Sequence, residues 1–327
     1  MPNDEKHAFA ELAKSHEICF HAGHLTEEDA DPTADVVSVF INSKVTSGVI
    51  DKIKNTKLIA IRATGFNNID LAAAKKHDIV VSTVPAYGEH TVAEYAFALL
   101  LSLTRKLQLT VEQVRRGDVN ANIIHGHDLN GRTMGVVGCG RIGKNVAKLA
   151  KAFGMKVVGF DPFPDEAEAK RVGFEYVSLD ELIKTADVIS LHAPMTKENF
   201  HLLGAEELAK TKRGVYIINT ARGELLDTLA LVEALQSGQV AGAGLDVLED
   251  ETLIDIDEEE LILRRNHVKR ASLEHAVAID ILSKMFNVII TTHNAYNTVE
   301  ALNRINTSTI ANIEGFFAGK PQNVVKL

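Results

Sequence analysis

The fold class follows from one stretch in the middle of the chain, GVVGCGRIGKNVA at residues 135–147. Its glycines Gly138, Gly140 and Gly143 have the spacing G-x-G-x-x-G, between a β-branched run that predicts a strand and a pattern that predicts a helix. The next predicted strand, KVVGFD, ends in the acidic residue Asp161. Glycine-rich hexapeptides arise by chance, but this strand–turn–helix–strand order is typical of a doubly wound α/β domain.

The glycine motif and the acid that follows it together predict a dinucleotide site. Gly138 permits a tight turn, Gly140 lets the backbone approach a pyrophosphate, and Gly143 allows close helix–strand packing. The free N–H groups and the dipole of the following helix favour that anion. We expect Asp161 to bind the adenosine ribose and to repel a 2′-phosphate, and the next residues, PFP, supply no arginine to offset its charge. The pattern therefore favours NAD over NADP; the alternative is an α/β domain that binds no nucleotide.

The composition indicates a globular protein of about two domains. The chain has 327 residues, of which 46% are hydrophobic and 24% charged, and domains usually have ~100–200 residues. The net charge of −9 argues against a nucleic-acid partner, which would need a basic surface. Cys19 and Cys139 are too few for a disulfide framework and wrongly spaced for a metal site; we interpret Cys139 as a packing residue. We find no secretory signal and no apolar run near the ~20 residues of a membrane span, so we expect a cytoplasmic protein without a metal.

Predicted strands alternate with helical patterns along the whole chain. This alternation predicts parallel sheets covered by helices on both faces, in two successive α/β series. The helix predicted at residues 91–107 is apolar on almost every side, so it is either a central core helix or a contact with another domain or subunit. The strands are predicted at residues 36–41, 57–62, 78–83, 132–138, 156–161, 187–194, 214–221, 242–247 and 287–293.

Seven segments in a fixed order carry a resemblance to a known family. They are TGFNNIDLAAA, VPAYGEHTVAEYAFALLL, GVVGCGRIGKNVA, ISLHAPMTKEN, GVYIINTARGELLDTLAL, GAGLDVLEDE and NVIITTHNAYNT. With them the chain resembles the D-isomer-specific 2-hydroxyacid dehydrogenases, and within that family the fermentative D-lactate branch. The resemblance implies two Rossmann-like doubly wound domains: a flavodoxin-like substrate domain at residues 1–89 and 296–327, and an NAD-binding domain at residues 90–295. The active site is then expected in the cleft between them. Because the chain begins within what reads as the family's first helix, we expect the strand that normally precedes it to be missing.

Two predicted strand ends carry the residues that the family uses for catalysis. Arg222, in NTARG, follows one of them, and sites of open α/β sheets form at such ends. A guanidinium fork can bind the carboxylate and carbonyl of a 2-keto acid together; the alternative for Arg222 is a surface ion pair. His293, in TTHNA, occupies the family's position for the acid/base. Only the resemblance assigns the D configuration of the product.

A carboxylate partner for His293 is implied by the same resemblance. Glu251 lies five residues after Asp246, which is the family's spacing for this partner. A neighbouring carboxylate favours the imidazolium form of a histidine. Glu249 is the rival, and the remaining acids of EDETLIDIDEEE at residues 249–260 are interpreted as a solvated loop.

The resemblance also implies binding positions, a reaction and an assembly. Substrate contacts are expected at Thr64, Gly65, Tyr87, Arg222 and Tyr296. Cofactor contacts beyond the three glycines and Asp161 are expected at Arg141, Ile142, Ala193, Pro194, Asn199, Thr220, Ala221 and Asp246. The expected reaction is reduction of pyruvate to D-lactate by NADH in a homodimer formed through the helix at residues 91–107. The alternatives are reductases of hydroxyisocaproate-, phenyllactate-, glyoxylate- or hydroxypyruvate-type substrates, and an NAD-sensing corepressor scaffold that binds peptides.

Overall fold

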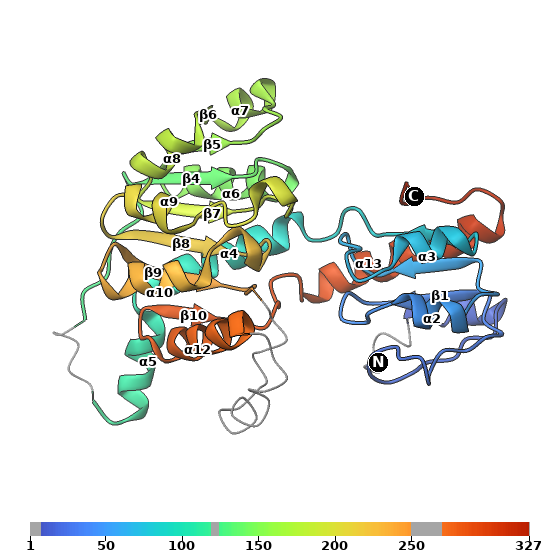
Figure 1. The fold of residues 1–327 in the computed structure, drawn as a ribbon. Helices are drawn as coiled ribbons and strands as arrows, with labels where there is room; N and C mark the ends of the chain where they lie inside the picture. The colour runs from blue at the N-terminus through green and yellow to red at the C-terminus, as the bar shows by residue number, and fades with distance from the viewer. Residues whose placement is uncertain (1–7, 119–123, 250–269, 327) are drawn as a thin grey trace. The chain divides into compact units, whose positions relative to one another are not determined.

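The computed structural model describes residues 8–118, 124–249 and 270–326, and divides the chain into two compact units (Figure 1). The first unit is discontinuous and comprises Met1–Gly88 with Asn297–Leu327, whereas the second is Glu89–Tyr296. Each unit is built on its own sheet, and neighbouring strands in both sheets are parallel. This confirms the predicted α/β fold class.

The second unit contains a seven-stranded sheet in the order β10-β9-β8-β7-β4-β5-β6. The order reverses between β4 and β7, which is the switch point of a doubly wound sheet. Its strands are β4 (Thr133–Val137), β5 (Lys156–Phe160), β6 (Glu175–Tyr176), β7 (Val188–Leu191), β8 (Val215–Asn219), β9 (Val240–Leu245) and β10 (Val288–Ile290). Its helices are α4 (Glu89–Thr104), α5 (Leu107–Arg115), α6 (Arg141–Ala152), α7 (Glu166–Val172), α8 (Leu179–Thr185), α9 (Ala205–Lys210), α10 (Thr228–Gln236) and α12 (Arg270–Lys284), with short 3₁₀ turns η3 (Lys197–Asn199) and η4 (Gly223–Leu225).

Both faces of this sheet are covered by helices (Figure 1). Helices α8, α9, α10 and α12 pack on one face, and α4 and α6 on the other. Strand β8 shows why the sequence folds this way, because all five of its residues are buried. Val215 and Ile217 enter the first core, whereas Tyr216 and Ile218 enter the second, as the period-two geometry of a strand requires. The continuous apolar runs seen in the sequence are therefore strands that are buried on both sides.

The first unit repeats this arrangement on a smaller scale. Its sheet has the order β1-β2-β3, and β2 again divides its side chains between two cores, with Ile59 and Ile61 on one side and Leu58 and Ala60 on the other. Its elements are η1 (Leu12–Lys14), β1 (Val36–Val39), α2 (Ser47–Lys52), β2 (Leu58–Ile61), α3 (Leu71–Lys76), β3 (Val80–Ser82) and α13 (Val299–Phe317). Helix α13 comes from the end of the chain and packs against β2.

Four details of the fold bear on the sequence-based expectations. The helix predicted at residues 91–107 ends as α4 at Thr104, because Lys106 adopts a left-handed φ of 49° and α5 begins one residue later. Helix α4 packs against α6, β8 and β9 of its own unit, which is the core-helix alternative. Among the described residues 8–35, no strand precedes β1. No helix in the described part of the chain has the length and apolarity to cross a bilayer.

Candidate active site

The predicted site residues of the second unit follow its strands. Because the strands of this sheet are parallel, the loops after them lie at one edge of it. The glycine turn follows β4, Asp161 follows β5, and Ala193 follows β7; Arg222, Asp246 and His293 follow β8, β9 and β10 respectively. Along this edge, the predicted nucleotide-binding residues follow β4, β5, β7, β8 and β9, and Arg222 and His293 follow β8 and β10.

The glycine turn has the geometry that a bound pyrophosphate needs. Gly138 has φ +86°, and a Cβ at this position would lie 2.5 Å from the backbone nitrogen of Ala193. A Cβ at Gly143 would lie 2.0 Å from the carbonyl oxygen of Gly138, whereas one at Gly140 would meet nothing within 4 Å. The backbone at Gly140 is therefore open to a ligand. Helix α6 begins at the next residue, Arg141, and no side chain caps its N-terminus.

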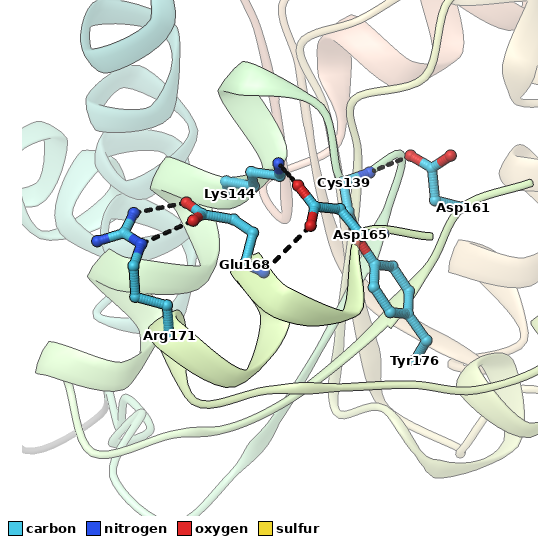
Figure 2. Close-up of polar contacts among 7 residues, drawn as sticks. All are labelled: Cys139, Lys144, Asp161, Asp165, Glu168, Arg171 and Tyr176. Atoms are coloured by element: carbon cyan, nitrogen blue, oxygen red, sulfur yellow. Dashed lines mark hydrogen bonds and ion pairs between the residues drawn. The ribbon is translucent and has the colours of Figure 1, made fainter. Parts of the chain in front are cut away.

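Asp161 is held in place by the backbone of the glycine turn (Figure 2). Its carboxylate accepts hydrogen bonds from the backbone nitrogens of Cys139 at 2.8 Å and Phe163 at 2.9 Å, one at each oxygen. Two backbone donors fix the orientation of the side chain while its negative charge remains. This is the preorganised acid that the predicted ribose contact requires.

The lysine that follows the glycine motif is paired with another acid (Figure 2). Lys144 Nζ lies 2.8 Å from Asp165 Oδ2, and this hydrogen bond lowers the pKa of the Asp165 carboxyl and raises that of Lys144. Asp165 is the N-cap residue of helix α7. Within that helix, Arg171 Nε donates to Glu168 Oε2 at 2.7 Å. These pairs neutralise both cations. Lys144 and Arg171 are thus each already paired with an acid, so neither is left open to bind a 2′-phosphate.

Cys139 packs beneath the motif, as expected, and has no reactive character. Its side chain is 3% exposed, and a Cβ added to Gly159 would lie 2.7 Å from its sulfur. Burial, and then the charge of Asp161, raise the pKa of the Cys139 thiol to about 12. The thiolate, which is the nucleophilic form, is therefore not populated at neutral pH.

Among the predicted cofactor positions after β7 and β8, one side chain lacks a hydrogen-bond partner in the described residues and another is bonded within its own loop. Thr220 Oγ1 is buried and has no hydrogen-bond partner in the described part of the chain, which is a reason to expect a ligand there. The Asn199 side chain is instead hydrogen-bonded within its own loop: it donates to the Pro194 carbonyl and accepts from the Thr196 nitrogen. Asn199 thus shapes the turn that contains Ala193 and Pro194. These features and the open glycine turn fit a dinucleotide.

Arg222 begins the turn after β8, where its backbone is braced by Asn219. The Asn219 side chain donates to the Arg222 carbonyl at 2.9 Å and accepts from the Ala221 nitrogen at 3.1 Å. One guanidinium nitrogen of Arg222 donates to the Ala221 carbonyl at 2.6 Å. No ion pair joins Arg222 to a carboxylate within residues 8–118, 124–249 and 270–326. The surface ion pair considered from the sequence is not found there.

His293 lies in a strained loop that Asp246 holds. The backbone φ of His293 is +50°, a left-handed conformation that is uncommon outside glycine. Asp246 is 1% exposed, and its carboxylate accepts hydrogen bonds from Thr291 Oγ1 and from the backbone nitrogens of Asn294 and Ala295, at 2.5–2.9 Å. The His293 nitrogen also donates to the Asp246 carbonyl. The structure therefore shows Asp246, predicted as a cofactor contact, as the anchor of the histidine loop.

Of the two candidate carboxylate partners for His293, the structure describes only Glu249. Glu251 lies outside the described residues. Glu249 is 6% exposed, and its oxygens accept hydrogen bonds from His201 Nε2 at 2.9 Å and Thr228 Oγ1 at 3.4 Å. The start of the acidic stretch is thus a buried, hydrogen-bonded residue. Glu249 therefore differs from the solvated acids expected in the rest of this stretch.

The remaining predicted substrate contacts lie at the ends of other elements. In the first unit, Thr64 Oγ1 donates to the Val84 carbonyl at 2.8 Å, and the Tyr87 carbonyl accepts from Arg304 Nε at 2.7 Å. Gly65 follows Thr64 in the loop after β2. Tyr296 is half-buried and is the last residue of the second unit.

Comparison with known proteins decides the family. Residues 97–295 match the family model described as D-isomer specific 2-hydroxyacid dehydrogenase, NAD binding domain. Over 331 residues the chain is 40% identical to 2-hydroxyacid dehydrogenase homolog 1 of Schizosaccharomyces pombe, covering 98% of this chain and 96% of that protein. The chain belongs to the D-isomer-specific 2-hydroxyacid dehydrogenase family.

Two further relatives show how the family divides by substrate. This dehydrogenase is 39% identical over 285 residues to an aromatic 2-oxoacid reductase of Clostridium sporogenes, covering 86% of this chain and 82% of that one. It also matches the crystal structure of D-lactate dehydrogenase from Aquifex aeolicus complexed with NAD and lactic acid, with a TM-score of 0.83 and 37% identity over 98% and 94% of the two chains. The predicted family and cofactor are confirmed: this chain is an NAD-dependent oxidoreductase of 2-hydroxy acids.

One half-buried histidine of the dehydrogenase has a measurable consequence for stability. His192 Nε2 lies 2.7 Å from Ser190 Oγ, and burial lowers the pKa of its imidazole to about 3. In the unfolded chain a histidine titrates near ~6.5. Between these values only the unfolded state gains the proton, so stability falls as the pH falls through this window.

We expect the H192N variant to lose less stability than the wild type as the pH falls. Going from pH 7 to pH 5, the wild type should lose up to ~1.4 kcal/mol of unfolding free energy per pH unit relative to H192N. Urea unfolding at pH 7, 6 and 5 measures the difference, with exposed His127→Asn as the matched control. Parallel pH profiles for wild type and H192N would contradict a neutral His192 in the folded protein.

Proposed function

We propose that this dehydrogenase reduces pyruvate to D-lactate in the cytoplasm, with Arg222, His293 and Glu251 as its catalytic residues. The observation that carries the proposal is the position of Arg222 and His293 after β8 and β10 of the sheet whose β4 ends in the glycine turn. A basic fork and an acid/base group at this edge match the two needs of keto-acid reduction. The unpaired cysteines, Cys19 and Cys139, fit a reducing compartment.

Each proposed residue has a separate chemical task. When bound, NADH supplies the hydride for C2 of the keto acid. Arg222 binds the carboxylate and polarises the carbonyl, because its planar fork can donate to both groups. His293 donates the proton to the carbonyl oxygen as that oxygen gains electrons. Glu251 supports the charged form of His293; Glu249 is disfavoured for this task, because its own oxygens already accept from His201 and Thr228.

The substrate is tested by following NADH absorbance with a panel of keto acids. Pyruvate, 2-ketoisocaproate, phenylpyruvate, glyoxylate and hydroxypyruvate are compared by kcat/KM at fixed NADH. We expect pyruvate to have the highest value, since the family includes D-lactate dehydrogenases such as that of Aquifex aeolicus. A higher value for phenylpyruvate would instead assign the chain to the group that includes the Clostridium sporogenes reductase. NADH binding without turnover of any keto acid would favour the peptide-binding scaffold.

We also propose that two copies of the chain associate near the junction of α4 and α5. Helix α5 has no buried residue, and Leu107, Val111 and Val114 on one face are 55%, 41% and 57% exposed. Their i, i+4, i+7 spacing forms an apolar stripe. A stripe of this kind in a monomer would leave hydrophobic area in water.

Light scattering after size exclusion tests this assembly. We expect the wild type at twice the chain mass and a V111E/V114E variant at the mass of one chain. Val277→Glu, at an equally exposed position on α12, is the control that should remain dimeric. A monomeric wild type, or a dimeric V111E/V114E variant, would refute association through α5.

A further inference from the structure

Two buried carboxylates follow strand β9, three residues apart, in a segment that contacts both catalytic loops. Asp246 is 1% exposed and Glu249 6% exposed, with the buried residues Val247 and Leu248 between them. Asp246 accepts three hydrogen bonds from the loop that contains His293. Glu249 lies on the Arg222 side of the same segment. The segment from Asp246 to Glu249 therefore meets the His293 loop through the Asp246 carboxylate and the Arg222 loop through its own backbone.

The contact with the Arg222 loop is made by backbone. A Cβ at Gly223 would lie 2.0 Å from the carbonyl carbon of Leu248 and 2.3 Å from the backbone nitrogen of Glu249. Gly223 directly follows Arg222 and begins η4. Only glycine allows two backbones to approach this closely. The position of Arg222 is thus sensitive to any movement of Glu249.

Glu249 is in turn contacted by side chains from three other segments: the turn after η3, helix α10 and helix α12. His201 Nε2 donates to one oxygen at 2.9 Å, Thr228 Oγ1 of α10 donates to the other at 3.4 Å, and His275 Nε2 of α12 lies 3.6 Å from that second oxygen. The other ring nitrogen of His201 lies 3.5 Å from Asp227 Oδ2. His201 therefore has a carboxylate oxygen beside each of its ring nitrogens.

The segment that contains Asp227 and Thr228 is continuous with the Arg222 turn. The backbone nitrogen of His201 donates to the Glu224 carbonyl at 2.8 Å, within η4. His201 itself has φ +51°, a strained conformation that the surrounding contacts must hold. Its hydrogen bonds reach η4 through the backbone and Glu249 through the ring. The start of η4 therefore packs on the Glu249 backbone, and its middle residue is linked through His201 to the Glu249 carboxylate.

We propose that Glu249 is a positioning residue of the active site, which fixes Arg222 through Gly223 and His201 and holds it in register with the His293 loop on Asp246. The inference rests on the proposed roles of Arg222 and His293. Glu249 does not contact the substrate; it keeps the two groups that do at a constant separation. Small displacements matter here, because a misplacement of ~1 Å at a catalytic group can reduce the rate by ~10²-fold.

The test compares Glu249→Gln and His201→Asn with the wild type. A glutamine cannot accept hydrogen bonds at both terminal atoms, and asparagine tolerates the left-handed backbone of position 201 but lacks the ring. Glu233→Gln, an exposed position on α10, is the matched control. The measurements are KM and kcat for the best keto acid, the Kd for NADH, and amide hydrogen exchange in peptides that cover residues 220–226 and 133–137.

We expect kcat/KM to fall by ~10–100-fold in both variants, with a raised KM, an unchanged Kd for NADH and faster exchange confined to residues 220–226. Kinetics equal to those of E233Q, or a uniform rise in exchange with an unchanged KM, would overturn the proposal. If E249Q does not fold, H201N supplies the same comparison. An inactive wild type would refute the proposed function instead, and the exchange data on residues 220–226 would still decide whether Glu249 holds the Arg222 turn.

Discussion

His293→Gln lowers the turnover of keto-acid reduction by about 10²–10⁴-fold, the usual contribution of a positioned acid or base, and leaves the Kd for NADH unchanged. Glutamine is similar in reach and can hydrogen-bond, but it does not donate a proton to an alkoxide. The loop itself should persist, because Asp246 binds Thr291, Asn294 and Ala295 rather than the imidazole. Stopped-flow measurement of NADH oxidation, with NADH binding followed by fluorescence, gives both quantities.

The matched control for this variant is His127→Gln. His127 is exposed, and its backbone nitrogen donates to the Thr104 carbonyl. We expect His127→Gln to match the wild type in kcat and KM. Near-normal turnover in H293Q would remove His293 from the chemistry, whatever the value for the control.

Arg222→Lys has the second large expected effect, a loss of about 10²–10³-fold in kcat/KM, as for removal of one donor that stabilises developing charge. Lysine keeps the positive charge but not the planar fork that can bind a carboxylate and a carbonyl together. The turn should remain folded, since Asn219 braces the backbone of Arg222 rather than its side chain. The change should appear in both KM and kcat.

Arg213→Lys is the control for this substitution. The Arg213 side chain is exposed and donates to the Ser237 carbonyl, so its replacement should leave the kinetics unchanged. Steady-state kinetics of both variants at saturating NADH make the comparison. A kcat/KM for R222K within twofold of the wild type would show that the substrate carboxylate is bound elsewhere.

The fold could be predicted from the sequence because it depends on short motifs and on periodic patterns of apolar residues. Strands such as β8 are buried on both faces, so they appear as unbroken apolar runs that are hard to mistake. The glycine motif identified the turn between β4 and α6 for the same reason, since each glycine answers a steric need within a few residues. The end of α4 was missed because it depends on the left-handed backbone of Lys106, and lysine gives no sign of that conformation. The two-residue strand β6 is too short to form a pattern.

The sequence predicted only those site residues that lie at the ends of predicted strands. Asp161 and His293 are the last residues of predicted strands, and Arg222 directly follows one. Because the strands are parallel, the sequence predicted that all three residues lie at the same edge of the sheet. The partners of Asp246 and Glu249 lie 45–49 and 21–48 residues away in the sequence. No spacing rule connects them, and Glu249 stands among acids that are expected to be solvated. The close approach at Gly223 likewise requires the backbone of Leu248, which only the folded structure brings there.

Isotope transfer tests the proposed reaction most directly. The chain is incubated with pyruvate and NADH that carries deuterium at the transferable C4 position, and the product is analysed by mass spectrometry and chiral chromatography. We expect lactate with one deuterium at C2 and the D configuration, formed at a rate that falls in H293Q and R222K. L-lactate, lactate without deuterium, or no product from pyruvate or any other keto acid while NADH binds normally would contradict it.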